Sequence, residues 1–313
     1  MMEEQLLTVN DLHISYGDAD VVSQVSFSVK KGEIVCIVGE SGCGKSSVLK
    51  AILGLPSLET VVTGGSIVFE GRELTSMNTK QRCRLMGVEI GFVPQNPGSS
   101  FNPVRSYEQQ FRETLSSHGR RFDQAEVLDC FEKLHLTYGA DILKSYPYEM
   151  SGGMNQRIAI ALAMLLRPKL LLCDEVTSAL DVTTQKLVVE ELMQFRENCG
   201  TAILFVTHNL GVAAKMADII IVMYAGHLME YGQSKKVLKT PAHPYTKCLM
   251  VAVPDFSGEL PCGLDGQPPL EGATMETCAF EPRCPYAGDM PHKNPYKMKQ
   301  VSDGHFSCCT GRA

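Results

Sequence analysis

The sequence lacks a hydrophobic run long enough to cross a membrane. The longest uninterrupted apolar stretch covers residues 158–166 and ends at Arg167, whereas a membrane-spanning helix needs about 20 mostly apolar residues. The first residues include two acidic side chains where a secretory signal would be basic, which predicts that the chain is not exported. We also find no repeat of fixed period and no low-complexity tract. These absences predict a globular protein that does not itself span a bilayer.

The sequence also has no excess of basic residues. The 29 Lys and Arg residues are outnumbered by 35 Asp and Glu residues, and the formal net charge is −6. Because contacts to phosphates dominate the affinity of most nucleic-acid-binding proteins, this balance argues against nucleic acid as the partner, although local basic patches stay open.

A glycine-rich loop between a predicted strand and a predicted helix is the most informative feature present. The strand covers residues 34–38, and the loop ends in Gly44, Lys45 and Ser46. This spacing is that of a P-loop, whose backbone N–H groups surround phosphates while the lysine reaches the outer ones and the Ser hydroxyl holds Mg²⁺. The helix that follows directs its N-terminus at the bound anion. The predicted nucleotide contacts are Gly39, Ser41, Gly42, Cys43, Gly44, Lys45, Ser46 and Ser47.

The pattern along the chain predicts an α/β fold. Short strand-like runs in the first 75 residues indicate an antiparallel sheet, and unbroken apolar runs at 170–173, 202–206 and 219–223 are typical of parallel strands buried on both faces. We predict an ATP-binding domain over residues 1–240 with a helical insertion at about 79–165. After about Pro241 the composition changes, and the sequence becomes rich in Pro, Gly and Cys. Residues 241–313 are therefore predicted to form a Cys-rich C-terminal extension.

Two acids end the apolar run at 170–173. Asp174 at a strand end can reach the Mg²⁺ shell, and Glu175 is placed to polarise a water molecule against the γ-phosphate. Further upstream, Ser151, Gly152 and Gly153 form a turn that opens a helix, which is a second potential anion site. Two anion sites in one chain suggest that the second serves a nucleotide held by a different subunit.

The Ser-Gly-Gly turn resembles the signature of the ATP-binding cassette (ABC) family. The resemblance implies a P-loop nucleotide-binding domain with a parallel-sheet core, an antiparallel β subdomain and an inserted helical subdomain. It also implies ATPase activity with ATP and Mg²⁺. Four further residues fit the family pattern: Tyr16 as the adenine platform, Gln95 as the sensor of Mg²⁺ and water, Asp181 in the dimer-facing loop, and His208 as the γ-phosphate switch.

Other motifs resemble the ATP-binding subunits of bacterial importers for dipeptides, oligopeptides or nickel. They are residues 98–103, 146–157, 177–185, 243–246 and 278–287. The resemblance implies a second cassette subunit, two transmembrane permease subunits and an external solute-binding protein as partners. It places the chain on the cytoplasmic face of the cell membrane, with the segment around Phe101, Pro103 and Phe111 as the permease contact. The alternative is that these apolar residues pack the inserted helices. The alternative function is that of a soluble ABC ATPase that acts on ribosomes or DNA.

The C-terminal region is rich in cysteine. In a reducing compartment, clustered thiolates favour an iron–sulfur cluster or zinc over disulfides. Members of the importer group can carry a four-iron cluster on a similar tail, which predicts a [4Fe-4S] site here, with zinc and no metal as the alternatives. The candidate ligands are Cys262, Cys278, Cys284, Cys308 and Cys309.

Overall fold

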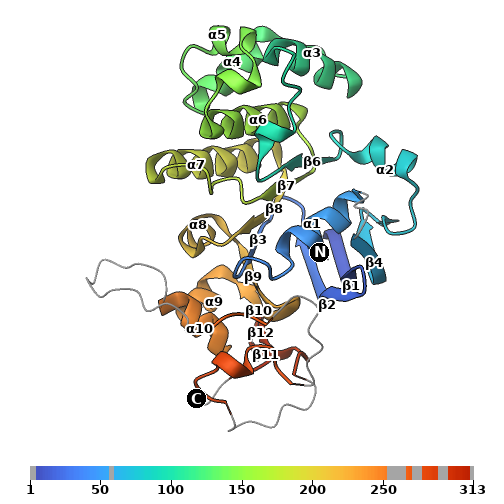
Figure 1. The fold of residues 1–313 in the computed structure, drawn as a ribbon, viewed down its shortest axis with the longest axis vertical. Helices are drawn as coiled ribbons and strands as arrows, with labels where there is room; N and C mark the ends of the chain where they lie inside the picture. Colours follow the sequence, from blue (N-terminus) through green and yellow to red (C-terminus); the bar gives the residue numbers. More distant parts are fainter. Residues whose placement is uncertain (1–4, 56–59, 252–265, 270–276, 288–294, 311–313) are drawn as a thin grey trace. The chain divides into compact units, whose positions relative to one another are not determined.

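The computed structural model describes residues 5–55, 60–251, 266–269, 277–287 and 295–310. Contacts divide the chain into two compact units, which we describe separately (Figure 1): Met1–Met77 with Val206–Ala313, and Asn78–Phe205. Over the described ranges, no helix combines the length and the apolar character that a bilayer crossing requires.

The first unit contains an antiparallel sheet in the order β2-β1-β4-β5. Its strands are β1 (Gln5–Tyr16), β2 (Ala19–Lys30), β4 (Thr60–Phe69) and β5 (Arg72–Glu73). The sequence predicts an antiparallel sheet here, although the polar pair Asn10 and Asp11 interrupts the apolar pattern of β1. In the structure the pair forms an irregularity inside one strand, where Asp11 adopts a φ of 45° and the pairing with β2 shifts register. Such a bulge lets a strand continue through a sequence that otherwise indicates a turn.

The first unit also contains the strand that leads into the glycine loop. Strand β3 (Ile34–Val38) is buried at every position and pairs in parallel with β9 (Ile219–Tyr224). On the other side, β9 pairs antiparallel with β10 (His227–Gln233). The helices of this unit are α1 (Lys45–Leu53), α8 (Leu210–Met216), α9 (Ser234–Lys239) and α10 (Pro244–Val251). The predicted strands at 34–38 and 219–223 are thus confirmed, and their burial explains their uninterrupted apolar character.

The end of the chain adds strands to this same sheet. Strand β12 (His305–Ser307) pairs antiparallel with β10, and β11 (Lys299–Ser302) pairs with β12. The sequence does not predict either strand, because both are short and mostly polar. Their formation depends on β10, which offers its open edge to them.

The second unit combines strands with a group of helices. Strands β8 (Ala202–Thr207), β7 (Leu170–Asp174) and β6 (Ile90–Val93) are neighbours in that order. The last two residues of β8 belong to the first unit. The predicted strands at 170–173 and 202–206 are confirmed. Strand β6, parallel to β7, lies inside the segment that the sequence predicts as helical. Its four residues are too few to give a clear periodic signal.

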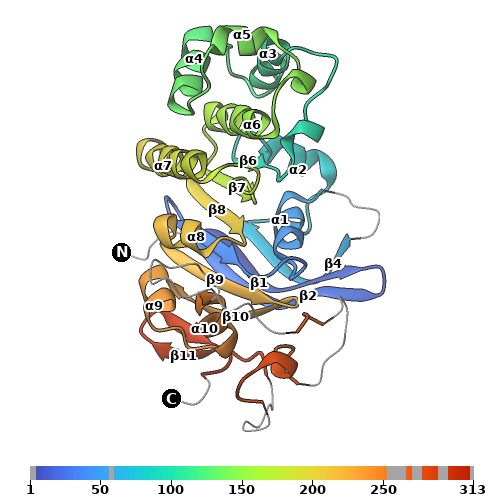
Figure 2. The ribbon, with the colours of Figure 1, turned by 60° about the vertical axis from the view of Figure 1, so that its left-hand side comes forward.

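The helices of the second unit are α2 (Thr79–Leu85), α3 (Tyr107–Ser117), α4 (Gln124–Lys133), α5 (Gly139–Lys144), α6 (Gly152–Leu166) and α7 (Val182–Cys199). Helices α2 to α6 lie within or overlap the segment that the sequence predicts as helical, at about 79–165. In both views α3, α4 and α5 lie together beside α6 (Figure 2). Phe111 of α3 and Phe131 of α4 are fully buried and meet edge to face, with ring centroids 5.6 Å apart. For Phe111 the structure therefore supports packing of the inserted helices over a permease contact, because its ring belongs to the core of this helical group.

Candidate functional site

The glycine loop lies between β3 and α1 in the first unit and has the backbone that a P-loop needs. Gly42 and Gly44 adopt φ values of 79° and 94°. A side chain on Gly44 would also meet Cγ2 of Val22 at 2.8 Å, so this position requires glycine for both conformation and space. Helix α1 begins directly after Gly44, and no side chain caps it. The first N–H groups of the helix therefore remain suited to an anion such as phosphate.

The side chain of Lys45 is 4% exposed and lies along the loop. Its Nζ atom donates hydrogen bonds to the carbonyl oxygens of Gly39 at 2.9 Å and Glu40 at 2.7 Å. The Sγ atom of Cys43 is 3.7 Å from the same nitrogen. Burial raises the pKa of the Cys43 thiol, while the charge of Lys45 acts in the opposite direction. The loop therefore presents one fixed cation together with backbone donors, which suits a phosphate chain.

Two further predicted residues belong to the first unit. Tyr16 ends β1 and is 49% exposed. His208 follows β8 and is exposed, directly before α8. Asn209, the next residue, caps that helix by accepting hydrogen bonds from the N–H groups of Gly211 and Val212. The cap fixes the start of α8 next to the predicted switch residue.

The predicted acids lie at the carboxyl end of β7 in the second unit. Asp174 is the last residue of the strand and is 7% exposed. Glu175 adopts a left-handed backbone conformation with a φ of 47°, which is unfavourable for a residue other than glycine. The amide Nε2 of Gln95, which follows β6, donates a hydrogen bond to the Oε2 atom of Glu175 at 3.0 Å. The structure thus brings together Gln95 and Glu175, although 80 positions separate them in the sequence.

The Ser-Gly-Gly turn starts α6 in the same unit. The hydroxyl of Ser151 accepts a hydrogen bond from the N–H group of Met154 at 3.3 Å, which makes it the N-cap of the helix. A side chain on Gly152 would meet nothing within 4 Å, whereas one on Gly153 would lie 3.1 Å from Leu180. The turn therefore has an open side at Gly152, and Gly153 is packed against the loop that precedes Asp181.

Asp181 caps α7, the helix after that loop. Its carboxylate accepts hydrogen bonds from the N–H and the hydroxyl of Thr184 at 3.0 Å and 2.6 Å. These bonds lower the pKa of Asp181. The contact between Gly153 and Leu180 places the signature turn beside the loop that Asp181 ends, as expected if both face one ligand.

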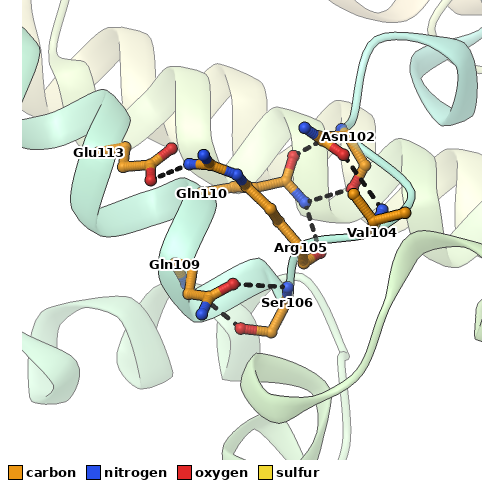
Figure 3. Close-up of polar contacts among 7 residues, drawn as sticks. All are labelled: Asn102, Val104, Arg105, Ser106, Gln109, Gln110 and Glu113. Atoms are coloured by element: carbon orange, nitrogen blue, oxygen red, sulfur yellow. Dashed lines mark hydrogen bonds and ion pairs between the residues drawn. The ribbon is translucent and has the colours of Figure 1, made fainter.

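The segment that follows Gln95 is tied to α3 by a buried amide (Figure 3). Gln110 accepts a hydrogen bond from the N–H of Asn102 at 2.8 Å and donates to the carbonyls of Asn102 and Arg105. Ser106 and Gln109 form a reciprocal capping box at the start of the helix. This scaffold leaves Val104 79% exposed. The N–H of Val104 donates a hydrogen bond to the side-chain oxygen of Asn102 at 3.1 Å, which holds this residue in the loop.

The described tail cysteines are not gathered into the predicted metal site. Burial raises the pKa of Cys278 to about 11 and also raises that of Cys284, and the charge of Cys309 adds to both shifts. Cys308 is buried, with its sulfur 3.8 Å from the sulfur of Met229. Cys262 lies outside the described residues. Within the described ranges, no three His, Cys, Asp or Glu side chains gather into a group that could hold a metal ion. The iron–sulfur site stays a prediction without structural support.

Three residues beside the P-loop are missed by the sequence reasoning. Arg283 pairs with Glu40, and the hydroxyl of Tyr245 accepts a hydrogen bond from the Glu40 N–H group. More than 200 positions separate both residues from Glu40. No local pattern marks such a contact.

Comparisons with known proteins show which families the chain matches. Residues 22–178 match the family described as ABC transporter, and residues 229–290 match the family described as oligopeptide/dipeptide transporter, C-terminal region. The oligopeptide transport ATP-binding protein OppD of Salmonella typhimurium is 37% identical over 97% of this chain and 93% of its own length. The dipeptide transport ATP-binding protein DppD of Escherichia coli is 36% identical over 97% of this chain and 96% of its own length.

Solved structures show the same fold. The post-hydrolysis dimer of the ATP-binding cassette MJ0796 with ADP and Pi has a TM-score of 0.66 and 25% identity, and the match covers 73% of this chain and 98% of that one. A structure titled as the ATP binding subunit of an ABC transporter has a TM-score of 0.62 and 27% identity, and its match covers 74% of this chain and 91% of that one. Both matches extend over most of the solved chains.

Proposed function

The chain belongs to the ABC transporter family, and on that premise we propose that it is the ATP-hydrolysing subunit of a peptide importer. The observation that carries the proposal is the glycine loop that ends in the buried Lys45 at the uncapped start of α1. Such a loop binds the phosphates of a nucleoside triphosphate. Two relatives that match almost their full lengths are named for oligopeptide and dipeptide transport, which supports peptides as the cargo. Nickel, the other predicted cargo, has no support from these names.

The catalytic roles follow from the chemistry of the residues. Lys45 and the first N–H groups of α1 neutralise the phosphates, and the exposed ring of Tyr16 stacks on adenine. Glu175 acts as the general base towards water, and its hydrogen bond with Gln95 fixes the carboxylate. His208 contacts the γ-phosphate. Ser151, Gly152, Gly153 and Asp181 bind the nucleotide held by a partner subunit.

The donor set fits magnesium. The hydroxyl of Ser46, the carboxylate of Asp174 and the amide oxygen of Gln95 are hard oxygen ligands of the kind that Mg²⁺ prefers. Mg²⁺ supplies a positive charge that offsets the charge on the transferred phosphate. The protein contributes the loop, the base and the partner-facing turn.

The proposed partners are a second cassette subunit, two permease subunits and an external solute-binding protein. The Ser-Gly-Gly turn supports the first, because a second anion site is needed only if two chains share nucleotides. The exposed Val104 on its rigid loop supports a permease contact. Docking on permeases would hold the chain at the cytoplasmic face of the membrane.

We keep the division into a cassette over residues 1–240, with a helical insertion at about 79–165, and a Cys-rich extension over 241–313 as part of this proposal. The family match over residues 229–290 supports a distinct C-terminal region. No step of the proposed reaction passes through the predicted iron–sulfur cluster. Anaerobic purification with iron, zinc and sulfide analysis tests that prediction separately, and protein free of all three would reject it.

The direct test is reconstitution. The chain, co-expressed with candidate permease and receptor subunits, should hydrolyse ATP faster when peptide-loaded receptor is added. The same preparation should import peptide into vesicles. Co-purification with ribosomes or DNA in place of membrane subunits would favour the alternative soluble ATPase and reject the importer.

A further inference from the structure

The C-terminal extension makes a direct contact with the P-loop. Arg283, in the 3₁₀ turn Glu281–Arg283, donates from Nη1 to the Oε2 atom of Glu40 at 2.7 Å and from Nη2 to its Oε1 atom at 3.0 Å. The side chains of Arg283 and Glu40 are 5% and 24% exposed. Two parallel hydrogen bonds between a guanidinium and a carboxylate, shielded from water, are the strongest form of this pairing.

An aromatic cluster formed by Tyr224, Tyr245 and Phe280 supports the pair. All three rings are fully buried, and their centroids lie 4.6 to 5.4 Å apart. Tyr224 accepts a further hydrogen bond from Nη1 of Arg283 at 3.2 Å. Tyr245 accepts one from the backbone N–H group of Glu40 at 3.0 Å. The cluster joins β9, α10 and the extension, so it fixes Arg283 relative to the loop.

Glu40 transmits this contact to the phosphate-binding lysine. It is the residue after Gly39, and its carbonyl oxygen accepts the 2.7 Å hydrogen bond from Nζ of Lys45. Its side chain and its N–H group are held by Arg283 and Tyr245, while its carbonyl holds Lys45. All three polar parts of this one residue are thus engaged, and two of the three partners come from beyond residue 240.

We propose that Arg283 is a positioning residue for nucleotide binding: through Glu40 it fixes the backbone turn that orients Lys45. The inference rests on the proposed ATPase function and adds to it a role for the C-terminal extension inside the nucleotide site. Without Arg283, the Glu40 carboxylate would be partly buried and unpaired, and it would turn towards water. The carbonyl that holds Lys45 would move with it.

The experiment measures binding of the fluorescent analogue N-methylanthraniloyl-ATP, with Mg²⁺, to the full-length chain. Arg283→Gln should raise the dissociation constant by about tenfold, the scale of a lost charge-assisted hydrogen bond. In the reconstituted transporter the KM for ATP should rise similarly, while kcat changes by less than about twofold. This split separates loss of nucleotide binding from general damage, which would lower kcat through loss of active protein.

The chain offers a matched control. Arg72 also pairs with a carboxylate, that of Glu70 at 3.2 Å, and its guanidinium carbon lies 5.4 Å from the ring of Phe69. The corresponding distance from Arg283 to the ring of Tyr224 is 5.8 Å. Arg72→Gln should leave the dissociation constant unchanged. Arg283→Lys, which keeps the charge but not the paired hydrogen bonds, should fall between the wild type and Arg283→Gln.

A double-variant cycle adds a second criterion. If Arg283 acts through Glu40, combining Glu40→Gln with Arg283→Gln should weaken binding by much less than the product of the single effects. Should Arg283→Gln fail to fold, Tyr245→Phe removes only the hydroxyl that accepts the Glu40 N–H bond. It should weaken binding about threefold, in line with one lost neutral hydrogen bond.

The outcomes distinguish this inference from the proposed function. If the wild type does not bind the analogue, the ATPase function fails. If the wild type binds it and a folded Arg283→Gln variant binds within about twofold of the wild type, the inference alone is overturned; where Arg283→Gln does not fold, the same result for Tyr245→Phe overturns it.

Discussion

The amide of Gln95 donates a 3.0 Å hydrogen bond to the carboxylate of Glu175. The bond joins the residue that follows β6 to the residue that follows β7. It holds one carboxylate oxygen of a residue whose backbone is already in an unfavourable left-handed conformation. A group held in this way by both its main chain and its side chain is preorganised for one task.

Glu175→Gln should therefore abolish turnover. The amide cannot accept a proton from water, and the loss of a general base lowers rates by about 10²- to 10⁴-fold. Binding of ATP should persist, because the phosphate contacts lie on the P-loop. The measurements are phosphate release and retention of radiolabelled ATP by the assembled transporter. Hydrolysis at the wild-type rate would contradict the assignment of Glu175 as the base.

Ser151 and Ser106 offer a test of the signature turn. Both side chains cap a helix by accepting a backbone N–H, from Met154 and Gln109. Replacement of either by Ala should lower the free energy of unfolding by about 1 kcal/mol. Only Ser151→Ala should also reduce ATP hydrolysis, by about tenfold or more, because only that hydroxyl is proposed to contact a partner's nucleotide. Equal ATPase losses in the two variants would show that helix capping alone explains the effect.

Glu230 should be important for the stability of the first unit. It is fully buried, accepts hydrogen bonds from the N–H groups of Ala242 and His243 at 2.9 and 2.8 Å, and lies 2.6 Å from Nε2 of His305. Glu230→Ala leaves three buried donors unsatisfied and should lower the free energy of unfolding by about 3 kcal/mol or more. Urea denaturation of the wild type and the variant measures this difference in the free energy of unfolding.

Glu126→Ala is the control for that experiment. Glu126 pairs with Arg120 and Arg167 but is 31% exposed. Its loss should cost less than about 1 kcal/mol. A small effect at Glu230, comparable to that at Glu126, would refute the structural role given to the buried carboxylate.

His243 should make the protein less stable in mild acid. Burial, assisted by the charge of Lys247, lowers its pKa to about 3. The unfolded chain, with a pKa near 6.5, then binds more protons than the folded one between these two values. Stability from this group is complete above about pH 6.5 and is lost as the pH falls towards 3. Between pH 7.5 and 5.5 the loss should be about 1.4 kcal/mol.

The matched variant is His243→Asn. In the wild type, Nδ1 accepts a hydrogen bond from the N–H of Tyr245, and an Asn oxygen can replace that acceptor but does not titrate. Between pH 7.5 and 5.5, the free energy of unfolding of the variant should fall by about 1.4 kcal/mol less than that of the wild type. Denaturation curves at both pH values decide the matter, and parallel losses in the two proteins would exclude His243 as the cause.

Local patterns predict much of this molecule. Strands β3, β7, β8 and β9 are identifiable because burial on both faces requires continuous apolar runs. The glycine loop and the acids that end β7 are identifiable because phosphate and magnesium chemistry restricts neighbouring residues. Nothing local indicates β11 and β12, which exist only as partners of β10. The link between Glu40 and Arg283 is equally hidden, because it depends on how the distant parts of one unit pack.

The pairing of β12 with β10 has a practical consequence for anyone who wishes to shorten or graft this protein. A version cut after residue 240 would keep every motif of nucleotide chemistry. It would nevertheless remove Phe306, which pairs with Tyr231 of β10. It would also leave the buried carboxylate of Glu230 without its partner His305. The truncated protein should aggregate through the exposed edge of β10. Chimeras with other cassettes would do better to exchange residues 227–310 as one block.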